Sequence, residues 1–385
     1  LGIYTSSFAR TIDRYLIEQQ YYRVGADMTV RVFSTSGSGF SGGSPDDTQA
    51  ASMHISEFNQ MDNVLKATRF GEYPATAKLK SASVDGKFMG IDRAELGPVI
   101  FWRPDFAGIR LGYLLNALAV QQDTVLVPQD FLEQRNLEIG DFLQLQVRNS
   151  GESFTMNLQI VGVFNYFPRW YPEDDGPLFV GNLDYTFEQA QGELPHRILA
   201  RITSEFNERD FRREVINRGA QGVLMDEPAS RIASEQTRPE RQGLLGLLSI
   251  GFITSSLATM IGFLLYTIFS YQRRYVELGI LRAIGLSQAS MILSVAWELG
   301  LLILMGLVLG FAIGLIVSMM YIPYMQFVSN LSGIVPPYLV MIAWSEIAQI
   351  IGLFVVTFIV IMSIMLVNFG RKSIFQAVKL RETLR

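Results

Sequence analysis

The chain has 385 residues, of which 49% are hydrophobic and 18% are charged, a balance that favours a membrane protein with a large water-exposed part. The absence of cysteine excludes disulfides, thiolate zinc sites and cysteine nucleophiles. Residues 1–240 carry a net charge of −9 and residues 241–385 one of +5, which together give the formal −4. The acidic larger part argues against nucleic-acid binding, which needs a basic surface.

Residues 1–24 predict an amphipathic helix, because apolar side chains return with a helical period along one face. Arg10, Asp13, Arg14 and Glu18 interrupt any apolar run of bilayer length, so this helix is not predicted to span a membrane. We expect it to be a stalk that continues a first span missing before residue 1.

Residues 25–240 predict a mixed α+β domain, because short alternating runs are mixed with helical patterns. The expected strands are 26–33, 75–79, 83–91, 98–101, 124–128, 142–147, 156–164, 178–181, 197–202 and 222–226. The expected helices are 54–66, 129–135, 205–218 and a polar helix, 231–241, that leads into the membrane.

Two segments of this domain could have held a ligand, but their patterns favour plain loops. The Gly/Ser-rich stretch 34–47 lacks GxxxxGK[ST], so we expect a flexible loop and no phosphate site. The stretch 168–177 contains Glu173, Asp174 and Asp175, whose oxygens suit calcium but show no regular ligand spacing. His54 and His196 are far apart in sequence and predict no shared site.

Three apolar runs, 243–271, 291–322 and 347–369, each reach the roughly 20 residues that cross a bilayer. They predict an all-α transmembrane domain over 241–370, followed by a tail, 371–385. Positive charge gathers in the polar loop 271–290 and in the tail, whereas 323–344 has no Lys or Arg. This bias places the polar loop and tail in the cytoplasm and residues 25–240 outside it, in the plasma (inner) membrane. An exported domain needs a span before it, so we expect a fourth span, cut off before residue 1.

The polar loop predicts a short coupling helix over 273–286. Arg273 and Glu277 are spaced i, i+4 for a helix pair. Gly285 suits a left-handed end of that helix, and Ser287 suits a cap of the next one. The loop is either a charge signal that merely sets topology or a helix that docks on a cytoplasmic partner.

The segment RRYVELGILRAIGLS resembles the cytoplasmic loop of the FtsX-like permease family, the membrane subunits of MacB- and Lol-type ABC transporters. The matching positions are Arg273, Arg274, Glu277, Gly279, Arg282, Ala283 and Gly285. Trp297-Glu298-Leu299-Gly300 also resembles the family's glutamate near the start of the following span. The resemblance is strong over 240–385 and weaker at 123–128 and 139–141. It implies that the coupling helix contacts a cytoplasmic ABC ATPase, and that this partner, and not the chain itself, uses ATP and Mg. It also implies a second permease module, identical or different.

Two further features lie in the predicted spans. Gly306, Gly310 and Gly314 recur every fourth residue, which predicts a face for close helix packing. Glu298 is a possible functional intramembrane acid or an interfacial residue. No Walker motif, catalytic triad or metal site stands out, so the chain is not expected to be an enzyme.

The sequence therefore predicts a permease subunit that passes ATP-driven motion from an ATPase to its external domain. The family's cargoes imply export or extraction of a lipid, lipoprotein, peptide or drug. The alternative is a membrane-anchored receptor or an ion-coupled transporter that works without an ATPase. An ion-coupled transporter would need intramembrane charges, of which Glu298 is the one available, and a receptor would need more than a short tail.

Overall fold

The computed structural model describes residues 2–33, 54–79, 83–149, 151–220, 222–285, 287–324 and 335–371. The loop predicted over 34–47 and the tail 372–385 lie outside the described residues. The chain divides into two compact units. The helical unit comprises Leu1–Tyr15, Gln236–Ser329 and Tyr338–Arg385. The sheet unit comprises Leu16–Glu235 and Asn330–Pro337.

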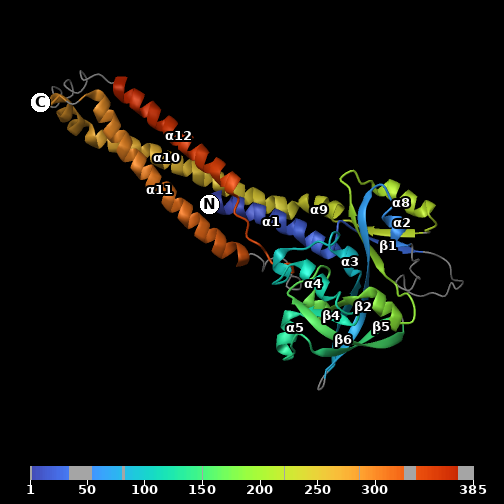
Figure 1. The fold of residues 1–385 in the computed structure, drawn as a ribbon. Helices are drawn as coiled ribbons and strands as arrows, with labels where there is room; N and C mark the ends of the chain where they lie inside the picture. Colours follow the sequence, from blue (N-terminus) through green and yellow to red (C-terminus); the bar gives the residue numbers. More distant parts are fainter. Residues whose placement is uncertain are drawn as a thin grey trace. The chain divides into compact units, whose positions relative to one another are not determined.

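The sheet unit is built on a nine-stranded mixed sheet within the described ranges (Figure 1). The strands are β1 (Met28–Phe33), β2 (Val64–Lys78), β3 (Ser83–Ile91), β4 (Thr124–Pro128), β5 (Phe142–Asn149), β6 (Glu152–Phe164), β7 (Leu178–Asn182), β8 (Arg197–Ile202) and β9 (Gly222–Asp226). Their order is β3-β7-β4-β6-β5-β2-β8-β1-β9. The pairs β3–β7 and β4–β6 are parallel, and the other pairs are antiparallel.

The long strand β2 closes part of this sheet on itself. Its first part pairs with β8, and its later part pairs with β5 on one side and β3 on the other. Because β3 also begins the strand order, the pairings β2-β3-β7-β4-β6-β5-β2 form a closed ring. Alternating residues of these strands fill its interior, including Phe88, Leu145, Leu158 and Phe179. Closure removes the sheet edges that those strands would otherwise expose.

The remaining strands, β8, β1 and β9, extend from β2 and carry a helical layer. Helices α2 (Ile55–Phe58) and α8 (Glu208–Asn217) cover them, with Phe58 and Phe211 fully buried. Strands β1 and β9 pair antiparallel, with Thr29 opposite Asp226 and Phe33 opposite Gly222. The chain therefore enters and leaves the sheet on neighbouring strands.

The connecting segments hold the shorter helices of the sheet unit. They are α3 (Arg93–Leu96), η1 (Pro104–Phe106), α4 (Leu111–Ala117), α5 (Gln129–Gln134), α6 (Pro172–Asp175), α7 (Leu183–Gln189) and α9 (Pro228–Gln236). A second core packs around Phe164, Phe167 and Trp170 beneath α3 and α4.

Most predicted strands are confirmed, and three predictions within the sheet and its loops are wrong. The helix expected over 54–66 ends at Phe58, because Val64 and Lys66 already pair with β8. The strand expected over 98–101 is a turn, in which the amides of Val99 and Ile100 donate to the Leu96 carbonyl. The acidic loop contains a helical turn, α6, that begins at Pro172, where a missing amide hydrogen costs nothing.

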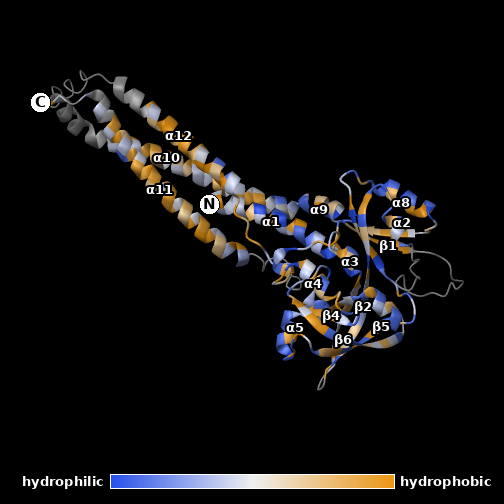
Figure 2. Cartoon of the chain, viewed as in Figure 1, coloured by the Kyte–Doolittle hydropathy of each residue, from blue (hydrophilic) through white to orange (hydrophobic). Residues whose placement is uncertain are grey.

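The helical unit contains the three longest apolar helices among the described residues: α10 (Pro239–Ala283), α11 (Gln288–Tyr324) and α12 (Trp344–Arg371). Each has a segment long and apolar enough to span a membrane: Leu245–Ser270, Leu293–Tyr324 and Trp344–Ile364. Figure 2 shows hydrophobic colours over much of their described lengths. The predicted fold class, an α+β domain with a helical membrane part, is confirmed for the described residues.

A helix is present over the predicted range as α1 (Gly2–Val24), although it buries polar Ser7, Thr11 and Gln20 and so lacks the clean apolar face that was predicted.

The boundary between the units falls inside α1, after Tyr15. The single polar helix expected over 231–241 is wrong. Instead, α9 ends at Gln236 and α10 begins at Pro239. Proline disfavours helical backbone in the residue before it and cannot donate to the previous turn, so it stands at the start of the new helix.

Candidate functional site

The first candidate site is the basic end of α10. The predicted coupling helix is not a separate helix: α10 continues without a break from the candidate span Leu245–Ser270 to Ala283. Arg273, Arg274, Glu277, Gly279 and Arg282 all lie in this extension. The sequence pattern missed this continuity because a polar segment between apolar runs looks the same whether the helix stops or goes on.

The end of this extension has the predicted geometry. Gly285 has φ +102°, the left-handed conformation that a residue with a side chain rarely adopts. The hydroxyl oxygen of Ser287 accepts a hydrogen bond from the amide of Ser290 at 3.2 Å, which caps α11. Only four residues, 284–287, separate α10 from α11.

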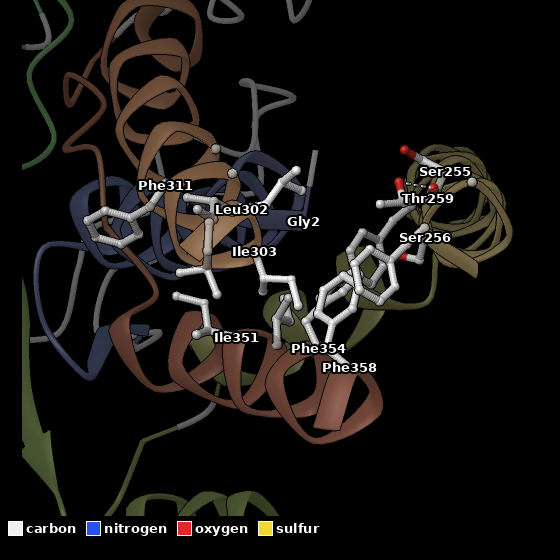
Figure 3. Close-up of a pocket in the computed structure, with 18 of the residues that line it drawn as sticks. Gly2, Ser255, Ser256, Thr259, Leu302, Ile303, Phe311, Ile351, Phe354 and Phe358 are labelled. Atoms are coloured by element: carbon white, nitrogen blue, oxygen red, sulfur yellow. Dashed lines mark hydrogen bonds between the residues drawn. The ribbon is translucent and has the colours of Figure 1, made fainter. Parts of the chain in front are cut away.

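The second candidate site is a cavity of about 610 Å³ in the helical unit, between α10, α11 and α12 (Figure 3). Leu302, Ile303, Phe354 and Phe358 supply apolar side chains from α11 and α12. On α10, the described polar lining residues Ser255, Ser256 and Thr259 lie together, and the Thr259 hydroxyl donates to the Ser255 carbonyl at 2.8 Å. Its size is that of a small-molecule pocket, and its surface is mainly apolar.

The three predicted packing glycines have different surroundings. Gly306 and Gly310 line the cavity, and a Cβ added at either would have no heavy atom within 4 Å. A Cβ added at Gly314 would lie 2.9 Å from Cδ1 of Ile3, so α1 packs closely there. Packing against a second permease copy stays a prediction.

Glu298 lies near the beginning of the candidate span in α11 and is exposed. It is ten residues after the start of α11 at Gln288, about 15 Å along the axis. It does not line the cavity, and no Asp, Glu, His, Lys or Arg is among the described lining residues. The structure thus separates Glu298 from the cavity, whereas an ion-coupled mechanism would need an acidic residue and a binding cavity together.

A charged network in the sheet unit was not predicted. The carboxylate of Glu72, on β2, accepts from Arg169 at 3.0 and 3.1 Å and lies 3.4 Å from Lys87 Nζ and 3.3 Å from Arg197 Nη1. Burial alone would raise the pKa of Glu72, but the three cations lower it to about 2. Arg169 has a left-handed φ of 71° and also donates to the carbonyls of Arg23 and Val24, at the end of α1.

This network joins the end of α1 to the sheet, and no sequence signal could have found it. Its members come from four separate strands and loops with no common spacing. The predicted carboxylate Asp175 contributes at its edge, 3.6 Å from Lys87 Nζ. No group of His, Cys, Asp and Glu within the described ranges could hold a metal ion.

The comparison with protein families bears on the helical unit. Residues 249–374 match the family model described as FtsX-like permease C-terminal. The matched range includes the basic extension of α10, the glycine series and all of α11. No curated protein matches the chain at a significant level.

Three solved structures show distant likeness. The periplasmic region of MacB from Actinobacillus actinomycetemcomitans is 10% identical with a TM-score of 0.36, covering 56% of this chain and 95% of that one. A domain of a putative permease from Porphyromonas gingivalis is 13% identical with a TM-score of 0.31, covering 53% and 89%. The extracellular domain of the ABC-type transporter YknZ from Gram-positive bacteria is 10% identical with a TM-score of 0.32, covering 51% and 98%.

The family match confirms the resemblance predicted from the polar segment after the first span. Residues 249–374 are thus similar to the C-terminal part of FtsX-like permeases, and the chain has three helices suited to span a membrane among its described residues.

Proposed function

We propose that the chain is the permease subunit of an ABC transporter, and that it passes the motion of a cytoplasmic ATPase to an extracytoplasmic sheet unit. The observation that carries this proposal is the family match over 249–374, which contains the basic extension of α10. In this role the chain hydrolyses nothing itself. ATP and Mg belong to the ATPase, and a second permease module completes the complex.

The form of α10 supports transmission by a rigid element. It has 45 residues, which at 1.5 Å per residue makes about 68 Å. An unbroken helix moves as one body when its end is displaced, whereas a flexible linker would absorb the displacement. An ATPase that contacts Arg273, Arg274, Glu277, Gly279, Arg282 and Gly285 would therefore act on the whole span.

The substrate class remains at the level of a lipid, lipoprotein, peptide or drug, exported or extracted from the membrane. An ion-coupled transporter is less well supported, because the cavity has an apolar lining without ionisable acids or bases among the described residues. A receptor function finds no specific support in either unit.

The test is co-purification of an ATPase with the full-length protein from its native membrane, in mild detergent. Glu277→Lys and Arg282→Glu each reverse one charge in the α10 extension and should reduce the recovered ATPase, and its ATP turnover, at least tenfold. Lys379→Glu, in the tail, is the matched control and should leave both unchanged. If both reversed variants retain the ATPase in full, the extension sets topology only.

A further inference from the structure

The connection between α11 and α12 has a described part, 335–343, that follows one face of α1 and is named the strap here. In the helical unit, the face of α1 that contacts the strap contains Ser7, Thr11 and Tyr15, which are spaced by four residues. The amide of Met341 donates to the Thr11 hydroxyl at 3.0 Å, and the amide of Ala343 donates to the Ser7 hydroxyl at 3.5 Å. Ser7 and Thr11 are fully buried, so these bonds are shielded from water.

Aromatic and ionic contacts flank these hydrogen bonds on the same unit. The rings of Tyr15 and Tyr338 stack with centroids 3.9 Å apart. Arg10 pairs with Glu346, at the beginning of α12, with 3.0 Å between Nη1 and Oε2. The partners run in opposite directions, from Tyr15 with Tyr338 to Ser7 with Ala343, as expected for an extended segment laid antiparallel on a helix.

In the sheet unit, a buried arginine holds the first part of the strap. Arg103 is 3% exposed and comes from the segment before η1. Its guanidinium donates to Glu18 of α1 at 2.5 Å, to Asp105 at 2.8 Å through Nε, and to the carbonyl of Pro337 at 3.1 Å. It also lies over the ring of Phe106, 5.2 Å from the centroid. One side chain thus links α1, the sheet unit's own loop and the strap.

We propose that the strap and α1 move as one body during the transport cycle, and that Arg103 is the positioning residue that fastens Glu18 of α1 to Pro337 of the strap within the sheet unit. The inference rests on the proposed function for its role in transport, although the fastening itself does not. A free loop between α11 and α12 would let α12 shift while α1 stays still. A strap bound along α1 instead makes a displacement of α12 a displacement of α1.

Hydrogen exchange of the full chain in lipid nanodiscs tests the fastening without any partner. Because Arg103→Met alone removes a cation beside the buried carboxylate of Glu18, the variant to use is Glu18→Gln with Arg103→Met, which removes both charges together. We expect the amides of Met341 and Ala343 to exchange at least tenfold faster in this variant and in Thr11→Val. Arg213→Gln, at an exposed site, is the control and should match the unaltered protein. Unchanged exchange in the variants would overturn the proposal.

The same proteins, bound to their ATPase, test the coupling. In the unaltered complex, ATP should change hydrogen exchange in the strands of the sheet unit. In the double variant the ATPase should still co-purify and hydrolyse ATP, but the response of the sheet unit should fall at least fivefold. A full response in the double variant would contradict a coupling role for Arg103. If no ATPase binds even the unaltered chain, the proposed function fails. Hydrogen exchange of the chain without a partner still tests whether the strap is fastened to α1.

Discussion

At the scale of single residues, the sheet unit places one carboxylate among three cations. Glu72 is 11% exposed at its side chain and is held by Arg169, Lys87 and Arg197. Removing one partner from such a buried group is costly, because the remaining charges keep their desolvation without compensation. Arg169 also binds the carbonyls that end α1, where a cation is favoured by the helix dipole. Glu72 therefore supports the seat of α1 as well as the sheet.

Glu72→Gln should destabilise the sheet unit by about 3 kcal/mol at pH 7, the free energy that corresponds to a pKa lowered from 4.5 to about 2. Because the folded pKa lies below the unfolded one, this stabilisation is present above about pH 4.5 and is lost as the pH falls towards 2. Urea titrations of the full chain, followed by hydrogen exchange in β2 and β3, should show the difference at pH 7 and its decline in acid. Glu152→Gln, at an exposed site, should show no difference at either pH. A gap that persists unchanged at pH 2 would contradict this account.

At the scale of elements, the sequence predicted what depends on local pattern. Short strand-like runs identified β3, β4, β8 and β9 at their observed bounds, and apolar length identified the three spans. Gly285 and Ser287 were correctly placed at the turn because caps are local features.

What depends on tertiary pairing could not be predicted. Val64 is strand because β8 lies beside it, and the ring closed by β2 needs partners distant in sequence. The candidate site shows the same division. The basic extension was visible in the sequence, whereas Arg103 and Glu72 gain their roles only from residues that folding brings together.

The glycine series in α11 gives an element-scale prediction with a built-in control. Gly314→Leu should destabilise the helical unit by about 1–3 kcal/mol, because its side chain must displace Ile3 of α1. Gly310→Leu should be neutral or stabilising, because its side chain enters the cavity and leucine favours helix over glycine. Thermal unfolding in nanodiscs, with hydrogen exchange of α1 as the local readout, compares them. Equal losses from both substitutions would show that α1 does not pack on Gly314.

At the scale of the whole molecule, the distribution of charge supports one orientation in the membrane. The sheet unit carries most of the acidic residues, and all but one of the basic residues of 241–385 lie in the α10 extension or from Arg371 onward. The positive-inside bias puts those basic ends in the cytoplasm and the sheet unit on the other side.

The absence of cysteine allows a direct test of this topology. Val120→Cys places a thiol in the sheet unit at a side chain 77% exposed, and Ile284→Cys places one after α10 at a side chain 74% exposed. A membrane-impermeant maleimide should label the first in intact cells and the second only after the membrane is opened. The cysteine-free parent is the blank. Labelling of Ile284→Cys in intact cells would reverse the proposed orientation.

The pairing of β1 with β9 makes the intervening chain an insert. Thr29 and Asp226 are partners across an antiparallel pair, so the two points of attachment lie about 5 Å apart. A segment with adjacent ends can be exchanged for another without stretching the chain on either side, as in domain insertion. Any cassette whose first and last strands are neighbours could be grafted here. Replacing the chain between β1 and β9 would therefore change the binding surface of the sheet unit while the helical unit stays the same.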